Sequence, residues 1–364
     1  METCLVTENQ KDEWDAIAIR ESFFALMQSW EWGNCKEKMG WKTFRIGVED
    51  NGEIIAGAQL LIRNLPLGIG TIAYLPRGPI GNWMDEDIAT ALFSKINQIA
   101  QNNKAIFLRM EPAVAFSEAV NDLLLKNQFK PSKYSIQPKS TIIMDISLSD
   151  EDILKNMRKS QKRKITTAER KGVIVRTGCS DDLKDFYKMM LITGKRSGFE
   201  PKPFDYYKTE WETFNKENKA CFLLASYQDT LIAAHIAYSF GNHAAFFHQV
   251  TSGEFANLNS NCLLVWEDIK WAKAQGCVTY DLWGIPDEIT ETSTEDEESE
   301  VERTDGLWGV YKFKRGFSKN IVSYIGTFDY VYKPIIYNSI MNKIINDKTP
   351  DKIQIWLNRF RESS

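Results

Sequence analysis

Residues 48–58 read VEDNGEIIAGA, and the same pattern returns without gaps at residues 225–235 as ASYQDTLIAAH. Each copy has two apolar stretches separated by a short polar segment, which is the pattern of two strands joined by a turn. Each is followed by further β-rich sequence, a helical pattern and a short apolar strand, IFLRMEP at 106–112 and VTYDLWG at 278–284. The repeated order of elements predicts a duplicated α/β unit.

The chain length of 364 residues exceeds what one hydrophobic core usually supports, so two or more domains are expected. Apolar residues make up 43% of the chain and charged residues 26%, an ordinary globular composition. No apolar run approaches the roughly 20 residues that span a bilayer, and the start METC does not resemble a signal peptide, which predicts a cytoplasmic protein. The six cysteines have no CxxC spacing, which disfavours a zinc site and predicts reduced, mostly buried thiols.

The formal net charge of −4 is unevenly distributed. Residues 287–305 contain ten acidic residues and one basic residue among Ser and Thr, a composition that predicts a flexible insertion. The rest of the chain has 39 acidic and 44 basic residues, so the folded body is mildly basic and suits a polyanionic partner.

A basic helix is expected after the junction between the two copies, which falls near residues 147–149. Residues 149–152 have the pattern of a capping box, and an apolar stripe follows at helical spacing. Residues 155–171 carry eight cations and one acid. Such a face is either simply solvated or a track for nucleic-acid phosphates.

Three short runs combine aromatic residues, a cation and glycine: QSWEWGNCK at 28–36, AYLPRGP at 73–79 and YKFKRGF at 311–317. Glycine lets the backbone approach a ligand closely, and Arg or Lys can meet a phosphate or a developing negative charge. In this order and spacing the runs resemble the Fem (FemABX-type) family of aminoacyl-tRNA-dependent peptidyltransferases, over roughly residues 20–340. Enzymes of that family add amino acids to the stem peptide of bacterial peptidoglycan precursors.

The resemblance implies an α/β (α+β) fold of two tandem GNAT-like (acetyltransferase-type) domains. No long coiled-coil arm is expected, because no long heptad pair interrupts the second domain. The first domain would comprise residues 1–145 with a C-terminal tail, 330–364, packed back onto it, and the second would comprise residues 146–329 with the acidic insertion. An acyl-CoA enzyme of this fold needs a Gly-rich turn before its phosphate-binding helix. Residues 254–262, EFANLNSNC, lack that pattern, which disfavours coenzyme A.

The implied reaction is attack by a stem-peptide amine on the ester of aminoacyl-tRNA, and it requires no metal or redox cofactor. An amine of pKa ~10.4 must lose a proton, and the oxyanion of the tetrahedral intermediate needs positive charge or donors. Lys314, preceded by Phe313, matches the Phe-Lys pair that the family places at the reacting centre. We expect Lys314 to stabilise the oxyanion or the leaving oxygen; the alternative is a charge on an edge strand.

Two more residues are catalytic candidates, each with a structural alternative. Glu111 stands where the family carries an acidic residue near the acceptor amine, although Asp is expected there. It either holds or deprotonates the amine or is a strand-end carboxylate. His248 stands where related sequences tend to carry tyrosine, and it is either a base, since histidine titrates near pH ~6.5, or a hydrogen-bonded structural residue.

Binding residues follow from the same resemblance. In the family a lysine of the first domain and an arginine of the second contact the diphosphate of the precursor. Lys36 matches the lysine, and Arg196 is the better match for the arginine, with Lys202 as the alternative. The other expected substrate-binding residues are Trp32, Tyr74, Arg77 and Tyr206. The residues of the basic helix expected to bind aminoacyl-tRNA are Arg158, Lys159, Lys162 and Arg163.

The predicted function is therefore an aminoacyltransferase that moves an amino acid from aminoacyl-tRNA to a peptidoglycan precursor, in cell-wall biogenesis and the maintenance of cell shape. The acceptor is either UDP-MurNAc-pentapeptide or a lipid-linked precursor. One rival is a GNAT-like acyl-CoA N-acyltransferase of surface polysaccharide synthesis, and another is a catalytically silent protein that binds RNA or the precursor. A monomer with at most peripheral membrane contact is expected, because the sequence has no obvious amphipathic anchor.

Overall fold

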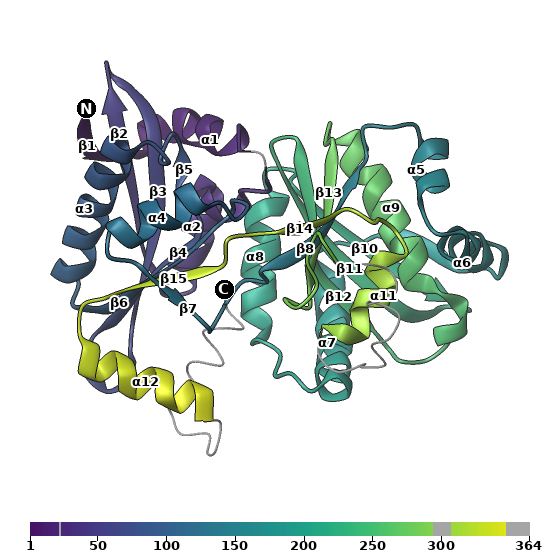
Figure 1. Ribbon diagram of the computed structural model, residues 1–364. Coiled ribbons are helices and arrows are strands. Elements are labelled where there is room, and N and C mark those ends of the chain that lie inside the picture. The colour runs from purple at the N-terminus through teal and green to yellow at the C-terminus, as the bar shows by residue number, and fades with distance from the viewer. Residues whose placement is uncertain (22, 294–306, 347–364) are drawn as a thin grey trace. The chain divides into compact units, whose positions relative to one another are not determined.

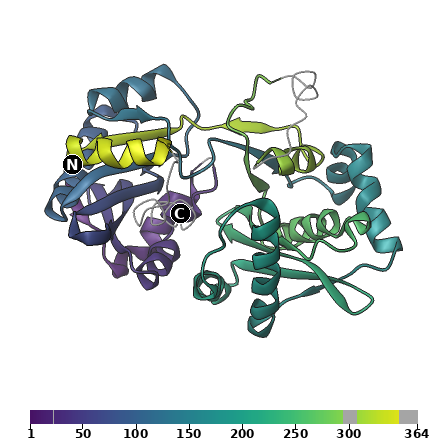
Figure 2. The same ribbon diagram turned by 90° about the horizontal axis from the view of Figure 1, so that it is seen from below.

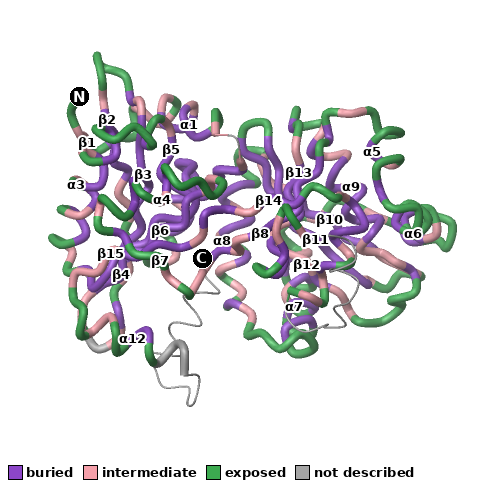
Figure 3. The backbone as a smooth tube through the Cα atoms, in the orientation of Figure 1, coloured by how far each residue is buried: buried purple, intermediate pink, exposed green. Residues whose placement is uncertain are grey.

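The computed structural model describes residues 1–21, 23–293 and 307–346, and the chain forms two compact units (Figure 1). Unit 1 comprises Met1–Gln137 and Tyr324–Ser364, and unit 2 comprises Pro138–Ser323. Buried residues concentrate in the strands of each sheet (Figure 3). Each unit therefore has its own sheet and its own core.

The elements of unit 1 form an eight-stranded sheet with helices packed against it. Its strands are β1 (Glu2–Leu5), β2 (Lys42–Asp50), β3 (Glu53–Asn64), β4 (Thr71–Arg77), β5 (Ile80–Gly81), β6 (Ala105–Pro112), β7 (Lys130–Ser132) and β15 (Thr327–Val331). Its helices are α1 (Lys11–Ile19), α2 (Trp30–Lys38), α3 (Glu86–Asn102), α4 (Glu118–Lys126) and α12 (Pro334–Asn346), with short 3-10 helices at Glu8–Gln10, Leu26–Gln28 and Pro66–Gly68. The strand order is β1-β2-β3-β4-β6-β15-β7, and β5 pairs with β3.

Unit 2 is built on a seven-stranded sheet of order β14-β8-β13-β12-β11-β10-β9. Its strands are β8 (Ser140–Asp145), β9 (Ile174–Thr177), β10 (Ala220–Tyr227), β11 (Thr230–Phe240), β12 (His243–Thr251), β13 (Thr279–Ile285) and β14 (Ile321–Ser323). Its helices are α5 (Asp150–Asn156), α6 (Lys159–Arg170), α7 (Leu183–Ser197), α8 (Phe204–Asn215), α9 (Ser260–Ala274) and α11 (Trp308–Arg315), with 3-10 helices at Ser180–Asp182 and Ala256–Leu258.

The repeated sequence forms the β2–β3 hairpin in unit 1 and the β10–β11 hairpin in unit 2. Both turns have positive φ at their two central residues, Asn51 (52°) and Gly52 (85°) in one and Gln228 (48°) and Asp229 (59°) in the other. Positive φ at both positions is the backbone of a type I′ turn, which matches the twist of the strands it joins. The ladders of both hairpins also shift register at equivalent positions, between residues 48 and 49 and between 225 and 226. The predicted duplication is confirmed at the level of the hairpin.

The two units are divided at other positions than the sequence suggested. β8 pairs with β13 and β14 in the sheet of unit 2, so the division falls after Gln137 and not after residue 145. β15 pairs with β6 and β7, so the second segment of unit 1 begins at Tyr324, before the expected tail at 330–364. Strand pairing decided both boundaries, and a sequence pattern does not reveal which strands pair.

The helix α12 lies along the sheet of unit 1 (Figures 1 and 2). Tyr337 packs edge-on against Phe107 of β6, with ring centroids 5.3 Å apart, and its hydroxyl donates to Asp329 of β15 at 2.8 Å. Asp329 also binds Arg109 of β6 in a buried ion pair at 2.7 Å. The rest of the expected tail, residues 347–364, lies outside the described residues, as do residues 294–306, which include most of the expected acidic insertion.

Helices cover both faces of the sheet in unit 2. Along β10 the residues Cys221, Leu223 and Ala225 join the core beneath α6 and α9, whereas Phe222 packs against Phe186 of α7 and Trp211 of α8. Alternate residues of a strand face opposite sides, so α7 and α8 share the face opposite α9.

Among the described residues no helix is longer than α3, with 17 residues, and no long coiled-coil arm is present. None of the helices in the described residues has the length and apolar character that crossing a membrane requires.

The basic segment after the junction forms two helices and not the single helix expected. The backbone of Met157 is extended, with ψ of 154°, which ends α5, and its side chain is buried. α6 then starts at the N-cap Arg158, whose N–H donates to the carbonyl of Gly316 at 2.9 Å. Gln161, which interrupted the predicted apolar stripe, is buried and donates to Sγ of Cys262 at 3.2 Å.

Candidate functional site

In unit 1 two of the three motif runs pack against each other through Gln28. Its Nε2 donates to the carbonyl of Pro76 at 2.6 Å, and its Oε1 accepts from the N–H of Gln59 at 2.8 Å. A Cβ added at Gly78 would lie 2.6–2.7 Å from the carboxamide of Gln28. The close approach predicted for this glycine is therefore made by a side chain of the protein itself.

Lys36 and Trp32 lie one turn apart on α2, whose N-cap Ser29 accepts from the N–H of Trp32 at 3.1 Å. Both side chains belong to residues only 1% exposed. The Nζ of Lys36 lies 4.2 Å from the centroid of the Trp32 ring, an attractive cation–π distance. The two expected substrate-binding residues thus form one buried pair.

Glu111 lies near the end of β6 with its carboxylate surrounded by donors. It accepts from the hydroxyl of Tyr74 at 2.6 Å, from the N–H groups of Ile136 at 2.6 Å and Gln137 at 3.1 Å, and from the hydroxyl of Thr327 at 2.9 Å. Burial, and then the charge of Glu111, raise the pKa of Tyr74 well above its ordinary value. A buried carboxylate whose two oxygens are both engaged by donors of the protein favours the structural alternative for Glu111.

Arg77 ends β4 with positive φ, at 55°. Its guanidinium lies 4.2 Å above the ring of Tyr324, and that ring also packs edge-on against Phe23, with centroids 5.3 Å apart. Because β4 and β6 are parallel and pair from Thr71 to Arg77, Arg77 and Glu111 lie at the same carboxyl edge of the sheet.

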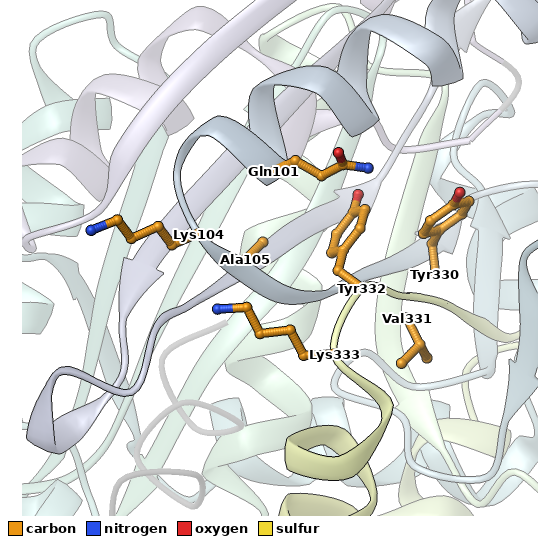
Figure 4. Close-up of a pocket in the computed structure, with 7 residues that line it drawn as sticks. All are labelled: Gln101, Lys104, Ala105, Tyr330, Val331, Tyr332 and Lys333. Carbon is orange, nitrogen blue, oxygen red and sulfur yellow. The ribbon is translucent and has the colours of Figure 1, made fainter.

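A hollow of about 460 Å³ lies at the opposite end of β6 (Figure 4). It is lined by Gln101, Lys104, Ala105, Tyr330, Val331, Tyr332 and Lys333. None of the predicted site residues lines it, so this hollow is separate from the carboxyl edge that holds Arg77 and Glu111.

In unit 2 Lys314 lies on the helix α11, which rules out the edge-strand alternative. The residue is 5% exposed, and its Nζ donates to the carbonyl of Gly284 at 2.7 Å. Burial lowers the pKa of Lys314 to about 8, with the charge of Asp281 acting in the opposite direction. Phe313, its neighbour on α11, is half-buried and packs against Phe317, with ring centroids 5.2 Å apart.

The carbonyl that binds Lys314 belongs to a bulge in β13, where pairing with β8 shifts between Asp281 and Gly284. Trp283 in this bulge has φ of 65°, and its N–H donates to Oδ1 of Asp281 at 2.7 Å. The same carboxyl oxygen accepts from the hydroxyl of Thr141. Bulges re-aim side chains, and this one turns the Trp283 ring against that of Phe247, with centroids 4.7 Å apart.

A second bulge lies on the neighbouring strand. β12 pairs with β11 at Phe246 and His248 but skips Phe247, so the rings of Phe247 and His248 come within 6.1 Å of each other. The parallel strands β12 and β13 pair only from residues 243–245 to residues 279–281, ahead of both bulges. The equivalent parallel pair of unit 1 continues to the ends of its strands, so only unit 2 has diverging strands at this point.

His248 is hydrogen bonded through Nε2 to Oε2 of Glu210, a residue of α8 that is 1% exposed. Glu210 also accepts from the hydroxyls of Tyr206 and Tyr238, both at 3.2 Å. The side chain of His248 retains 17% exposure. A buried carboxylate thus fixes one imidazole nitrogen of a histidine that solvent still reaches.

The expected binding residues of unit 2 fall into two places. Lys202 is buried, its N–H donates to the hydroxyl of Tyr207 at 3.2 Å, and its Nζ lies 5.8 Å from the ring of Tyr206. The ring of Tyr207 lies 5.2 Å from that of His248. Arg196 lies apart from this group, exposed, with its guanidinium donating to the hydroxyl of Thr251 at 2.7 Å. We call the following residues the α8 cluster: Lys202, Tyr206, Tyr207, Glu210, Tyr238 and His248.

Glu210 was not predicted from the sequence. Tyr206 and Glu210 are four residues apart, which places them on one face of a helix, and that spacing was the available signal. The pairing of Glu210 with His248 depends on the packing of α8 against the sheet and on the β12 bulge, neither of which leaves a local sequence signature.

The side chains of Arg158, Lys159, Lys162 and Arg163 are all exposed at the start of α6. α6 begins beside the end of α11, since Gly316 both accepts from the N–H of Arg158 and lies against Gln161. A Cβ at Gly316 would lie 2.7 Å from Oε1 of Gln161. The glycine of the third motif run therefore lets the basic helix approach the backbone two residues after Lys314.

The FemAB family model matches residues 9–128, 127–229 and 226–342. The chain belongs to the FemAB family. This FemAB protein is 23% identical to the lipid II:glycine glycyltransferase of Staphylococcus epidermidis, over 98% of each chain. It is 22% identical to the protein of the same name from Staphylococcus aureus, over 90% of this chain and 93% of the relative.

Solved structures agree on the fold. The FemAB protein superposes on the crystal structure of FemX with a TM-score of 0.81 at 21% identity, covering 93% of this chain and all of that one. A tandem GNAT protein from the clavulanic acid biosynthesis pathway gives a TM-score of 0.55 at 10% identity, over 91% and 98% of the two chains. The fold is α/β with two GNAT-like units in tandem, as expected from the sequence.

Proposed function

We propose that this FemAB protein transfers an amino acid from aminoacyl-tRNA to the stem-peptide amine of a lipid-linked peptidoglycan precursor. The protein is an aminoacyltransferase that acts on a peptidoglycan precursor, as family membership and relatives named lipid II:glycine glycyltransferase support. The observation that carries the chemistry is Lys314, a buried ammonium on α11 beside the bulge of β13. Positive charge in a water-poor site is what a developing oxyanion requires.

In the proposed reaction the acceptor amine attacks the carbonyl carbon of the aminoacyl ester. A C–N bond forms, the bond to the ribose oxygen breaks, and the proton lost by the amine is returned to that oxygen. Lys314 donates to the oxyanion through an N–H that Gly284 does not use, since an ammonium has three. His248 receives the amine proton while Glu210 holds the other side of its ring, the orientation role that a carboxylate plays for a catalytic histidine.

The exposed cations of α6 bind the phosphates of the tRNA. Their place next to Gly316 supports this assignment, because the N-cap of α6 is bonded to a residue only two positions after Lys314. Phosphate neutralisation releases counterions, so binding through α6 is expected to weaken as salt rises. In unit 1, the resemblance to the family supports Lys36, Trp32 and Arg77 as residues that bind the precursor, with Lys36 at its diphosphate. Because Lys36 is 1% exposed, its ammonium must leave the ring of Trp32 to reach that group.

The test is transfer of a labelled amino acid from a mixed pool of aminoacyl-tRNAs by the purified protein. Lipid-linked precursor and UDP-MurNAc-pentapeptide are offered in parallel, and labelled acetyl-CoA is offered as a rival donor. Label entering the lipid-linked acceptor with wild type, and not with Lys314→Ala, is the expected result. Saturable acyl-CoA turnover without transfer from tRNA would overturn the proposal in favour of the GNAT-like acyltransferase.

A further inference from the structure

The helix α7 presents large apolar side chains to solvent. Leu191 and Ile192 are each 48% exposed, and Phe199, just after the helix, is 41% exposed. Exposed apolar residues scattered singly need no explanation, but three within nine positions form a local feature of the surface. Solvated lysines accompany them, at Lys184, Lys188 and Lys195.

Helix geometry places the exposed lysines of α7, Leu191 and Ile192 on one face. At 3.6 residues per turn, the five positions 184, 188, 191, 192 and 195 fall within an arc of about 100°. The buried residues Phe186, Met189, Met190 and Thr193 lie on the opposite side, against β12 and α8. We call the following exposed residues the α7 face: Lys184, Lys188, Leu191, Ile192 and Lys195.

We propose that the α7 face docks on the surface of an anionic phospholipid bilayer. Lysines flank Leu191 and Ile192 on both sides along the axis, so the apolar side chains can enter the headgroup region while the ammonium groups remain with the phosphates. Each lysine near such a surface is attracted by its negative potential. Asp185 is the one acid within the helical segment 184–197, and it is already paired with Lys188 at 2.7 Å.

The composition of the α7 face favours a membrane over a protein partner. The core of a protein–protein interface is depleted of lysine, because each ammonium would be buried without water. On the α7 face a lysine stands within four residues of each apolar residue, so no lysine-free apolar patch exists for a protein to cover. A bilayer surface accepts this mixture of lysines and apolar side chains.

The inference rests on the proposed function in one respect, namely that the acceptor is lipid-linked. The buried side of α7 contacts the candidate site: the ring of Phe186 lies 6.5 Å from that of His248, and the hydroxyl of Thr193 donates to the carbonyl of Thr251 at 3.2 Å. A helix with its side chains is about 10 Å thick. Docking through the α7 face would therefore hold the α8 cluster roughly one helix diameter from the lipid surface, where a lipid-linked acceptor displays its polar part.

The experiment is sedimentation of the purified full chain with vesicles of phosphatidylcholine alone or of an equal mixture with phosphatidylglycerol, without any substrate. The test variants are Lys184→Glu with Lys195→Glu, and Leu191→Ser with Ile192→Ser. Lys104→Glu with Lys333→Glu in unit 1 is the charge-matched control, and Ile335→Ser, at an isoleucine 86% exposed, is the apolar control. Thermal unfolding of every variant shows that each is folded.

Binding of wild type to the anionic vesicles only, a loss of about tenfold or more in the charge variant and a clear loss in the apolar variant, with unchanged binding of both controls, would support the inference. Equal loss in the control variants, equal binding to both kinds of vesicle, or no binding would overturn it. Self-association that the double variant Leu191→Ser with Ile192→Ser abolishes, without vesicle binding, would assign the α7 face to a second copy of the chain and would also overturn it. Transfer to soluble UDP-MurNAc-pentapeptide, measured separately, reports on the aminoacyl-transfer chemistry without a membrane, so a failure of that chemistry is distinguishable from a failure of docking.

Discussion

His248 and Glu210 are joined by a hydrogen bond between a bulged strand and a helix, with the carboxylate buried and the histidine half-buried. Glu210 also accepts from Tyr206 and Tyr238, so its orientation is fixed independently of His248. A carboxylate held in this way determines which nitrogen of the imidazole faces away from it. This hydrogen bond allows the two alternatives for His248, a general base or a structural residue, to be tested, because they predict different effects of replacing Glu210.

Replacing Glu210 with Gln is expected to lower kcat for transfer by roughly 10²-fold, since general-base catalysis contributes about 10²–10⁴-fold. KM for the acceptor should change little, because the amide retains the shape of the carboxylate. His248→Gln should produce a loss of similar size. Tyr238→Phe is the matched control, as it removes one donor to Glu210 but leaves the bond to His248. Rates within twofold of wild type for Glu210→Gln at every pH would show that His248 is structural.

Lys314 is expected to lower stability at neutral pH. Its pKa in the folded protein is about 8, against 10.5 ordinarily, so between these pH values the unfolded chain binds more protons than the folded one. The stability of wild type should therefore rise with pH across this window, and the cost of the buried charge is fully present below pH 8. Lys314→Met should stabilise the protein at pH 7 by about 1–3 kcal/mol, after allowance for the missing bond to Gly284, and abolish transfer. Thermal unfolding of both proteins on either side of this window measures the difference, which should shrink at the higher pH.

In the proposed mechanism Lys314 acts as its ammonium form, so the rate of transfer should fall as pH rises through its pKa of about 8. Lys314→Arg keeps its charge throughout this range. Any activity that remains in this variant should lack the alkaline fall. An alkaline limb that is the same in wild type and in Lys314→Arg would assign the titration to another group.

The cations of α6 should control the affinity for tRNA and not the chemistry. Lys159→Gln combined with Lys162→Gln is expected to raise KM for aminoacyl-tRNA and to reduce the slope of log affinity against log salt by about 0.7–0.9 for each phosphate that is no longer neutralised. kcat at saturating tRNA should be unchanged. Lys104→Gln with Lys333→Gln, which removes two lysines of unit 1, is the control. A salt slope equal to that of wild type would leave α6 as a solvated face.

Much of the fold was predictable from the sequence, because the duplicated hairpins carry their own pattern of apolar and turn residues. The boundaries between the two units were harder to predict. β8 and β15 pair with strands that are far away in the sequence, and a local sequence pattern does not encode which strands pair. The helix that carries Lys314 was not predicted either, because YKFKRGF was interpreted as a strand. In the structure α11 includes Lys314, and Tyr311 and Phe317 pack in one core.

The candidate site was only partly predictable. His248 and Lys202 were selected separately, on resemblance, and the structure places both beside Tyr207. The same group includes Glu210, a charged residue on an otherwise ordinary helix, which becomes informative only once its burial is known. Conversely, Glu111 was a candidate for proton transfer, and its surrounding donors favour a structural role that no motif could reveal.

Replacement of Glu111 should therefore affect stability more than chemistry. Glu111→Gln exchanges a carboxylate for a carboxamide whose NH₂ cannot accept. With that NH₂ in place of Oε2, the hydroxyl of Tyr74 loses its acceptor and the N–H of Gln137 keeps only the bond of 3.2 Å to the remaining oxygen. Hydrogen bonds to a charged group are worth about 1.5–3 kcal/mol each, and a decrease of that size in unfolding free energy is expected. Under conditions in which the variant is fully folded, kcat should remain within a few-fold of wild type. A fall of more than about 10²-fold in kcat without loss of stability would instead identify Glu111 as the base that accepts the amine proton.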